Sequence, residues 1–528
     1  MSELPMKKSA RGMIMDTRPM YIEEWLETLP YIDFNKTAAL IEQALAATNN
    51  QDVKPGTRQE LNTLYHRPYQ YYLESQIKTG AQHTLSTIGA MQAQIRVMKK
   101  IASHLAYSSK LTFDKISQHK SIWKANKIPY ESLLMSMHYL SHALLFNYLE
   151  YSPIPKNVWK HLHAIYELAE SSQVQGMSFT LPGNEIKPVV SSFAETYKRI
   201  LMTSLVDPHH LPFGAIWEIY EQMKEWSQHV RLQVMQDVDD ATGKFILDLT
   251  SDQKPVPFVK NQPEKTTGTM RLLDASELVA LVNKHVASAQ HGKLKNTGLA
   301  LSPFYLKQVL SLMSSSWGTP STRSAERTAV KGQVKVCAGI ENVYYHMNGK
   351  QPFESPLNNE DDEDIDVTNV TGGGEGSRTK RYLSEVWRVV DQSSGGFALV
   401  REEKPDKDVR VGQLVAIAVG EQLDKYILGI IRWMMISKDV HKIGVEKLSR
   451  RARNIAIRAK DGSATDRTYR PAFLMENTDK VLLIVTEKGL YSSGRDLIAY
   501  KRDKENHIVA DKLIESGVVC ELFSFKEG

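Results

Sequence analysis

The feature that most constrains this chain is a change in the spacing of its apolar residues near residue 318. Before that point the spacing is helical, as in SLLMSMHYLSHALLFNYLEY, where apolar residues return once per helical turn. After it come short runs rich in Val, Ile and aromatic residues, such as QLVAIAVG and YILGIIRWMMI, bounded by turn residues. The chain therefore consists of a helical part followed by a β part.

At 528 residues the chain is too long for one hydrophobic core, so we expect several domains and a multidomain α+β fold. The β part holds enough short strands for two small barrels or sandwiches. We predict four segments: a flexible N-terminus (1–20), an all-α, helical-repeat-like domain (21–317), a first β-barrel (318–449) and a second small β-rich module (450–528).

Within the helical part, one pattern occurs twice: an apolar helix, a proline-containing break, and a new helix that carries a tryptophan. The two tryptophans are Trp159 and Trp217. A repeated unit of this kind is typical of stacked helical hairpins, each of which buries one face against the next. We interpret both tryptophans, together with Trp226, as core packing.

Composition excludes several classes of protein. Hydrophobic residues make up 42% and charged residues 24%, as in soluble globular proteins, and a formal charge of +5 does not call for a nucleic-acid partner. Two cysteines, Cys337 and Cys520, lie in apolar surroundings, which indicates buried thiols in a reducing compartment. No apolar stretch is long enough to span a membrane, so we expect a cytoplasmic protein. We find no P-loop, nucleophile elbow or usable Cys-His pair, so an enzyme is the weaker class.

Two groups of residues stand out at the start of the β part. Arg323 and Arg327 lie four positions apart in a linker, and arginine pairs bidentately with phosphate or with the O6 and N7 edge of guanine. Asp391, Ser393 and Gly396 lie in VVDQSSGGFAL, which predicts a hairpin with a glycine turn. Together the groups supply donors and an acceptor for a guanine nucleotide.

An Arg-x-x-x-Arg linker that enters a β-barrel and is followed by Asp-x-Ser-x-x-Gly on a later hairpin resembles the PilZ domain, the bacterial receptor module for cyclic di-GMP. The run from Gly429 to Trp433 and the turn from Ile443 to Val445 are also similar to later strands of that family. The helical part looks like the N-terminal region of longer bacterial PilZ-containing proteins.

The resemblance implies a PilZ-like barrel over 318–449 and a role for each residue. Arg323 and Arg327 would grip guanine edges and phosphates. Asp391 would accept from a guanine or orient an arginine, Ser393 would donate to a phosphate, and Gly396 would let the ligand approach the backbone. None of these roles is catalytic, and the resemblance implies no metal and no cofactor besides the ligand.

The resemblance also implies a function and a partner. The chain would be an effector that transmits cyclic di-GMP binding at the domain junction to a protein partner of a motility, adhesion or polysaccharide system.

Two alternatives stay open. An acidic and glycine-rich insertion, 354–380, separates the two motifs and predicts a surface loop. Its carboxylates could compete with the ligand for the arginines, which would leave a degenerate PilZ-like scaffold that acts through protein contacts without nucleotide. Less favoured is an RNA- or DNA-binding protein that uses the arginines between Arg450 and Arg458, because a charged strand edge explains those residues more simply.

Overall fold

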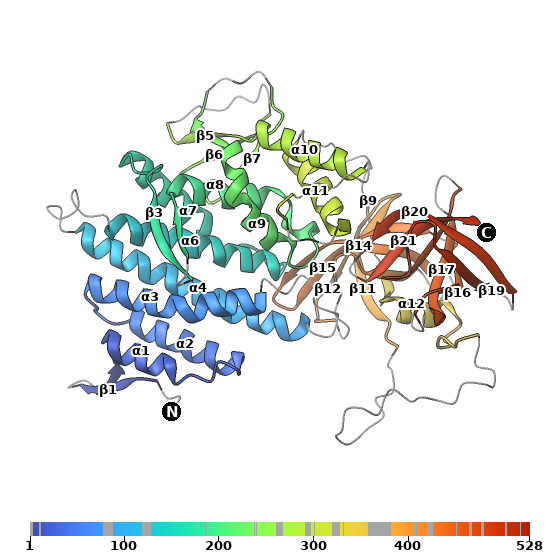
Figure 1. Cartoon of the computed structure of the whole chain (residues 1–528), viewed down its shortest axis with the longest axis horizontal. Helices are drawn as coiled ribbons and strands as arrows, with labels where there is room; N and C mark the ends of the chain where they lie inside the picture. Colours follow the sequence, from blue (N-terminus) through green and yellow to red (C-terminus); the bar gives the residue numbers. More distant parts are fainter. Residues whose placement is uncertain are drawn as a thin grey trace. The chain divides into compact units, whose positions relative to one another are not determined.

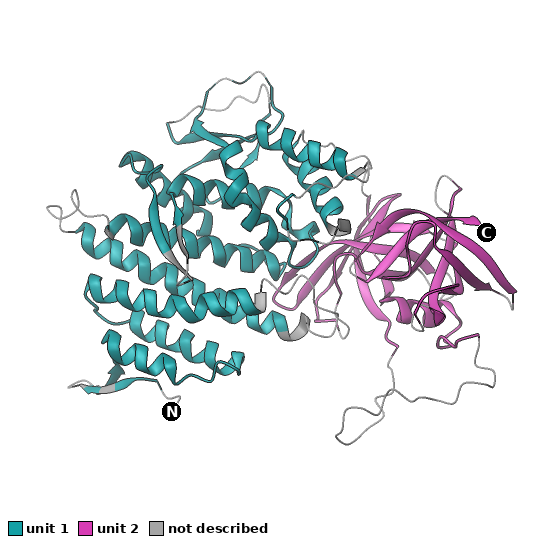
Figure 2. Ribbon diagram, in the orientation of Figure 1, with its two compact units in different colours: residues 1–322 teal, residues 323–528 magenta. Residues whose placement is uncertain are grey.

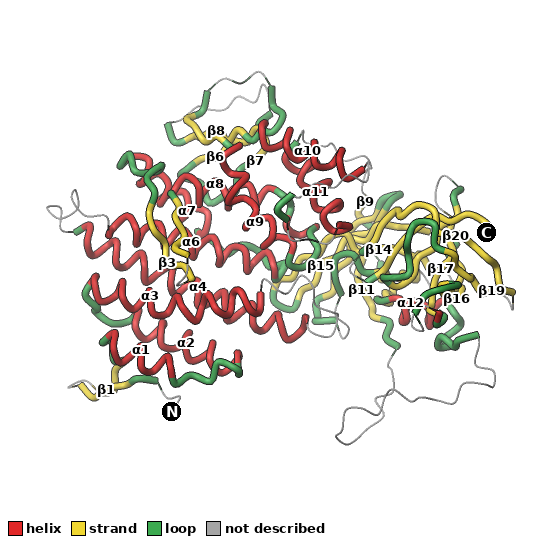
Figure 3. Tube along the Cα trace, viewed as in Figure 1, coloured by secondary structure: helices red, strands yellow, loops and turns green. Residues whose placement is uncertain are grey.

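The computed structural model divides into two compact units, residues 1–322 and 323–528 (Figure 2). Helices dominate the first unit and strands dominate the second (Figure 3). The structure describes residues 4–9, 12–77, 88–118, 128–184, 187–236, 238, 240–259, 268–290, 297–299, 301, 303–318, 328–330, 332–356, 382–405, 409–419, 426–449, 451–463, 467–476, 480–501, 504–517 and 519–528. Most of the predicted insertion and both linker arginines lie outside these residues.

The first unit is built mainly from helices, which confirms the predicted helical domain (Figure 1). Its α-helices are α1 (Pro19–Glu27), α2 (Phe34–Asn49), α3 (Pro55–Tyr72), α4 (Ile88–Ser117), α6 (Ile128–Leu149), α7 (Val158–Ser171), α8 (Phe193–Leu205), α9 (Ala215–Trp226), α10 (Ser276–Gln290) and α11 (Pro303–Trp317). Short helices η1 (Leu73–Ile77), η4 (Pro208–His210) and η5 (Ser227–His229) continue or join them.

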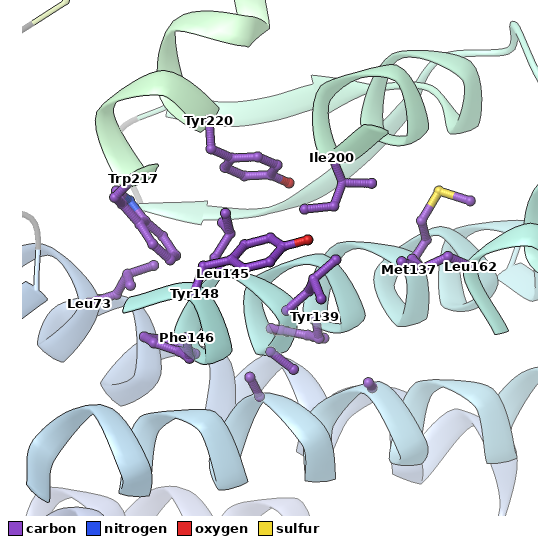
Figure 4. Packing of buried hydrophobic residues seen from close by; sticks show 14 of the residues in the cluster. Leu73, Met137, Tyr139, Leu145, Phe146, Tyr148, Leu162, Ile200, Trp217 and Tyr220 are labelled. Atoms are coloured by element: carbon purple, nitrogen blue, oxygen red, sulfur yellow. The ribbon is translucent and has the colours of Figure 1, made fainter. Parts of the chain in front are cut away.

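Helix α6 forms the centre of this unit because it is apolar on every side, as a fully buried helix must be. It packs along α4 on one side and against α7, α8 and α9 on others. The rings of Phe146 on α6 and Trp217 on α9 lie 5.6 Å apart in this core (Figure 4). His142 accepts or donates a hydrogen bond of 2.8 Å with the Tyr69 hydroxyl of α3, so buried polar groups also join the helices.

The repeated helix, proline break and tryptophan pattern corresponds to two helix pairs. Helix α6 leads to α7 and α8 leads to α9, and the tryptophans that begin α7 and α9 are 4% and 1% exposed. Trp159, Trp217 and Trp226 are all core residues, which confirms their interpretation as packing. The Ser192 side chain caps α8 by accepting from the Glu195 amide.

Short strands also occur in this unit. Residues 6–15, within the N-terminal tail of the sequence, hold the paired strands β1 (Met6–Ser9) and β2 (Gly12–Met15). A hairpin is formed by β3 (Phe179–Asn184) and β4 (Lys187–Ser191). A small sheet has the order β5-β8-β6-β7, with β5 (Arg231–Val234), β6 (Lys244–Asp248), β7 (Val256–Pro257) and β8 (Met270–Asp274).

The second unit contains two closed six-stranded barrels, which confirms the predicted barrel and second β module. The first barrel consists of β10 (Gln333–Ala338), β11 (Glu385–Gln392), β12 (Gly396–Arg401), β13 (Leu414–Val419), β14 (Tyr426–Ser437) and β15 (Val440–Ser449). It closes because β10 pairs with both β13 and β11, and a short strand, β9 (Thr328–Ala329), is added to β11.

The second barrel consists of β16 (Arg453–Ala459), β17 (Arg470–Glu476), β18 (Leu482–Glu487), β19 (Asp496–Lys501), β20 (Lys504–Ser516) and β21 (Cys520–Glu527). Numbered within each barrel, the strands follow the same circular order, first, second, third, sixth, fifth and fourth. The two barrels are therefore copies of one topology.

Helix α12 (Ile340–Met347) packs between the two barrels. Around it lies a shared core that includes Val343 of the helix, Ala416 of the first barrel and Phe473 of the second. Cys337 and Cys520 are both buried there, which confirms the prediction of buried thiols from their apolar surroundings.

Candidate functional site

The predicted hairpin is formed by β11, β12 and the turn between them. The Ser393 amide donates to the Gly396 carbonyl at 3.0 Å, which closes the turn. A bulge between Val389 and Asp391 precedes it, and bulges commonly re-aim side chains next to functional sites. Asp391 and Ser393 are both half-buried.

Gly396 is required by close packing. A Cβ atom at this position would lie 2.6 Å from the Val445 carbonyl oxygen of β15, nearer than real Cβ atoms approach backbone. At Gly395 the same atom would meet nothing within 4 Å. Gly396 therefore allows β12 to pack tightly on β15, whereas this packing does not require a glycine at position 395.

Lys447 on β15 holds the turn from the other side. Its amide donates to the Gly395 carbonyl at 2.8 Å, and its ammonium donates to the Ser393 carbonyl at 2.6 Å. The ammonium also lies 4.2 Å from the centre of the Phe397 ring, a favourable cation–π distance. The backbone of the turn is therefore fixed before any ligand arrives.

The arginine linker ends at this hairpin. Arg323 and Arg327 themselves lie outside the described residues, but Thr328 and Ala329, which follow at once in the sequence, form β9. Thr328 pairs with Gln392 and Ala329 pairs with Asp391. The pairing of β9 with β11 thus brings the end of the arginine linker next to the Asp391 hairpin, although the two motifs lie far apart in the sequence. The sequence analysis missed β9 because two residues carry no periodic signal.

The outer face of the first barrel next to the turn is a row of four residues on four adjacent strands. Asp391 is paired with Ala398, Ala398 with Gly444, and Gly444 with Trp433. Directly paired residues point to the same side of a sheet, so these four share one face. The sequence suggested no role for Trp433, since only the strand register places it in line with Asp391.

A charged group connects this region to the second barrel. The Arg432 guanidinium donates to Glu446 on β15 at 2.5 Å and forms a bidentate pair with Glu515 on β20. Burial lowers the pKa of Arg432, but the hydrogen bonds and charges of both carboxylates outweigh it and raise the pKa above its usual value. Arg432 remains cationic at any physiological pH.

A polar cleft of about 540 Å³ lies at the other end of the same hairpin. It is lined by Gln333, Ser384, Glu385, Val386, Arg388, Val400, Arg401, Glu402 and Glu403. Its arginines already have carboxylate partners, with Arg401 3.7 Å from Glu385 and Arg388 3.4 Å from Glu402. The cleft therefore offers little uncompensated charge to a ligand.

The arginines proposed for nucleic-acid binding differ in their surroundings where the structure describes them. Arg450 lies outside the described residues, and Arg451 and Arg453 are exposed. Arg458 lies 3.7 Å from Glu505 and 5.1 Å from the centre of the Tyr469 ring, so its charge is compensated within the second barrel. Among the described residues, no group of His, Cys, Asp and Glu could hold a metal ion. Nor does any described helix have the length and apolarity to cross a membrane.

Comparison with known proteins assigns two regions. Residues 21–238 match the family model described as the N-terminal domain of the cyclic-di-GMP receptor FimW, and residues 244–371 match that of its middle PilZ domain. The chain is also 21% identical over 486 residues to the cyclic-di-GMP receptor FimW of Pseudomonas aeruginosa strain PAO1, covering 82% of this chain and 77% of that protein. No solved structure matches. The matched PilZ range includes the arginine linker, β9 and β10, and ends before the Asp391 hairpin.

Proposed function

The chain belongs to the PilZ-containing FimW family of cyclic di-GMP receptors, and from this premise we propose that it binds cyclic di-GMP with the arginine linker and the Asp391 hairpin. The ligand is a dianion with two guanines, so it needs cationic donors for its phosphates and guanine edges and an acceptor for the guanine N1 and N2 protons. The linker supplies the donors and the hairpin supplies the acceptor.

One observation carries this proposal. The pairing of β9 with β11 brings the chain that leaves Arg327 directly opposite Asp391. Consecutive Cα atoms are about 3.8 Å apart, so chain connectivity alone keeps Arg327 near the hairpin. In the proposed site Arg323 and Arg327 grip phosphates and guanine edges, Asp391 accepts from a guanine, and Ser393 donates to a phosphate.

The proposed mechanism is signal transmission without catalysis. The linker lies where the helical domain (21–317) meets the PilZ-like barrel (318–449), boundaries that form part of the proposal. Ordering of the linker around the ligand shifts the equilibrium between two arrangements of these domains, provided that the ligand binds one arrangement more tightly. The output goes to a cytoplasmic protein partner of a motility, adhesion or polysaccharide system.

The binding test is isothermal titration of cyclic di-GMP into the intact chain and into the Arg323→Ala, Arg327→Ala double variant. Each bidentate arginine contact to guanine contributes about 1–3 kcal/mol, so loss of both weakens binding by roughly thirty-fold or more. The matched control is the Arg451→Ala, Arg453→Ala double variant, which removes two exposed arginines from the second barrel and leaves the affinity unchanged.

Absence of binding to the intact chain, by heat and by competition, would refute the nucleotide site and favour the degenerate scaffold with its 354–380 insertion. Small-angle scattering with and without ligand tests transmission separately. Superimposable profiles would contradict the domain shift while leaving the binding result intact.

A further inference from the structure

The polar cleft of about 540 Å³ lies at the end of the β11–β12 hairpin that is away from the polar turn. Arg388 is paired with Gln333 on β10 and with Val400 on β12, so these three side chains share the outer face of the first barrel. Glu385 and Arg401 lie an odd number of positions along their strands from this row, which turns them to the opposite face. The cleft therefore opens at the rim of the barrel, and the mouths of β-barrels often hold small ligands.

The Arg401 guanidinium in this cleft is compensated in charge but makes no hydrogen bond to any described residue. Its side chain is 15% exposed, and its Nη1 and Nη2 atoms lie 3.7 Å from a Glu385 oxygen and 3.8 Å from a Glu403 oxygen. Both separations are too long for hydrogen bonds, which span about 2.7–3.2 Å between nitrogen and oxygen. The donors on Nη1 and Nη2 are therefore available to an acceptor that enters the cleft.

The charges around the cleft select the kind of acceptor. A guanidinium presents two parallel N–H groups that match the two oxygens of a carboxylate or a phosphate. The described lining contains two arginines and three glutamates, Glu385, Glu402 and Glu403. A dianionic phosphate would add to this excess of negative charge, whereas a carboxylate on a molecule that also carries a cation would not. The cleft therefore suits a zwitterion better than a nucleotide.

Glu403 is placed to receive the cation of such a zwitterion. Its side chain is 86% exposed, and its ion pair with Arg401 is long, so it can turn toward a ligand. Glu402 differs, because it already accepts a hydrogen bond of 3.4 Å from Arg388. In an α-amino acid the ammonium is carried by the carbon next to the carboxylate. A carboxylate held by Arg401 thus brings the ammonium within reach of Glu403.

The lining also offers an apolar surface. Val386 is 48% exposed, and Val400 is buried on the same face of the neighbouring strand. An aliphatic or aromatic side chain that covers Val386 removes this apolar surface from water. The volume of about 540 Å³ lies within the range of roughly 300–1,000 Å³ that is usual for small-molecule sites, and it accommodates a single amino acid with a large side chain.

We infer that this cleft binds an α-amino acid with an apolar side chain. Arg401 receives its carboxylate, Glu403 receives its ammonium, and Val386 contacts its side chain. The site is separate from the arginine linker and the Asp391 turn, so the inference does not depend on the proposed nucleotide site. It gives the chain a second small-molecule input, of a different chemical class, on the same pair of strands.

A purely structural role for Arg401 makes a different prediction. In that case its ion pairs with Glu385 and Glu403 only close the rim of the barrel, and no amino acid binds. Replacement of the arginine then lowers the melting temperature and has no effect on any ligand.

The test is isothermal titration of the full chain, without nucleotide, with L-alanine, L-valine, L-leucine, L-methionine and L-phenylalanine. At least one of the larger amino acids is expected to bind and to raise the melting temperature. The N-acetyl derivative of the tightest binder lacks the ammonium, and its amide lacks the carboxylate. Each derivative is expected to bind about ten-fold or more weakly than the amino acid, because hydrogen bonds to charged groups are strong.

Two variants assign the two ends of the ligand. Glu403→Gln changes an exposed side chain, and it is expected to weaken binding of the amino acid about ten-fold while leaving the N-acetyl derivative unchanged. Arg401→Gln is expected to weaken both, and its melting temperature shows whether it is folded. Glu476→Gln, an exposed glutamate of the second barrel, is the matched control and leaves binding unchanged.

The inference is overturned if none of the five amino acids binds, which would leave Arg401 with its structural role. It is also overturned if the N-acetyl derivative binds as tightly as the amino acid, because the cleft would then recognise any carboxylate, such as the C-terminus of a peptide. Unchanged binding by Glu403→Gln would contradict the assignment of the ammonium. None of these outcomes bears on the nucleotide site, since no cyclic di-GMP is present.

Discussion

The two barrels of the second unit share one strand order but use the same outer face in opposite ways. In the first barrel the face of β11, β12, β15 and β14 carries the row from Asp391 to Trp433. In the second barrel the equivalent strands carry Phe473, Val485 and Leu522, which are buried in the shared core around α12. The first face carries a carboxylate, two buried small residues and an indole, whereas the second is apolar and packed in the shared core.

The difference shows that two barrels with the same strand order can carry different kinds of residue on the equivalent face. The turn of the first barrel has Asp391, Ser393 and Gly396, whereas the corresponding stretch of the second reads ENTDKVL, with no glycine. In the second barrel the residues of the equivalent face pack in the shared core. Glu515, which is paired with Leu522 on that face, accepts a hydrogen bond from Arg432 of the first barrel. A shared strand order therefore does not imply shared binding residues, because function depends on the residues placed on a fold.

The largest expected effect comes from breaking the packed face. Phe473 is fully buried, so Phe473→Ala removes a large side chain from the shared core and lowers the free energy of unfolding by about 3–5 kcal/mol. Calorimetry of the full chain measures this in the transition of the second unit. The control Val390→Ala removes a side chain that is 41% exposed on the first barrel and costs under about 0.5 kcal/mol. A loss of less than about 1 kcal/mol for Phe473→Ala would contradict the assignment of this face to packing.

An intermediate effect is expected at the turn. Gly396→Ala places a methyl group against the Val445 carbonyl, and because backbone must move to accept it the cost is about 1–3 kcal/mol. Gly395→Ala meets open space and stays within about 0.5 kcal/mol of the intact chain. Thermal unfolding of both variants gives the comparison, and titration with cyclic di-GMP shows whether affinity follows stability. Equal stability of the two variants would show that close packing of β12 on β15 is not what requires the glycine.

The smallest effect concerns the thiol in the shared core. Burial raises the pKa of Cys520 to about 12, with a smaller contribution from nearby Glu515. The folded protein therefore keeps the thiol neutral where the unfolded chain ionises it, above about pH 9, so this contribution is complete at lower pH and is lost as pH rises. Chemical unfolding at pH 8 and pH 10 is expected to show about 1 kcal/mol less loss in Cys520→Ala than in the intact chain. An equal decrease in the free energy of unfolding in both proteins would show that the Cys520 thiol is exposed to solvent in the folded protein.

Local patterns predicted much of this architecture. The helical period anticipated α6, α7, α8 and α9 with their buried tryptophans, because an amphipathic or wholly apolar period is a local property. Alternating arms around a glycine anticipated the β11–β12 hairpin for the same reason. The site was predicted as two separate motifs, and the roles of Arg323, Arg327, Asp391, Ser393 and Gly396 remain predictions that titration decides.

By itself, the sequence determined most of the longer helices and strands and where the polar turn lies, since those features depend on neighbours within a few residues. Only the tertiary structure decided that β9 pairs with β11, that both barrels close in the same order, and that Gly444 and Trp433 lie in line with Asp391. These outcomes depend on the register between strands far apart in the chain. A shift of one residue would turn every side chain to the opposite face, and only packing of the whole barrel selects the register that occurs.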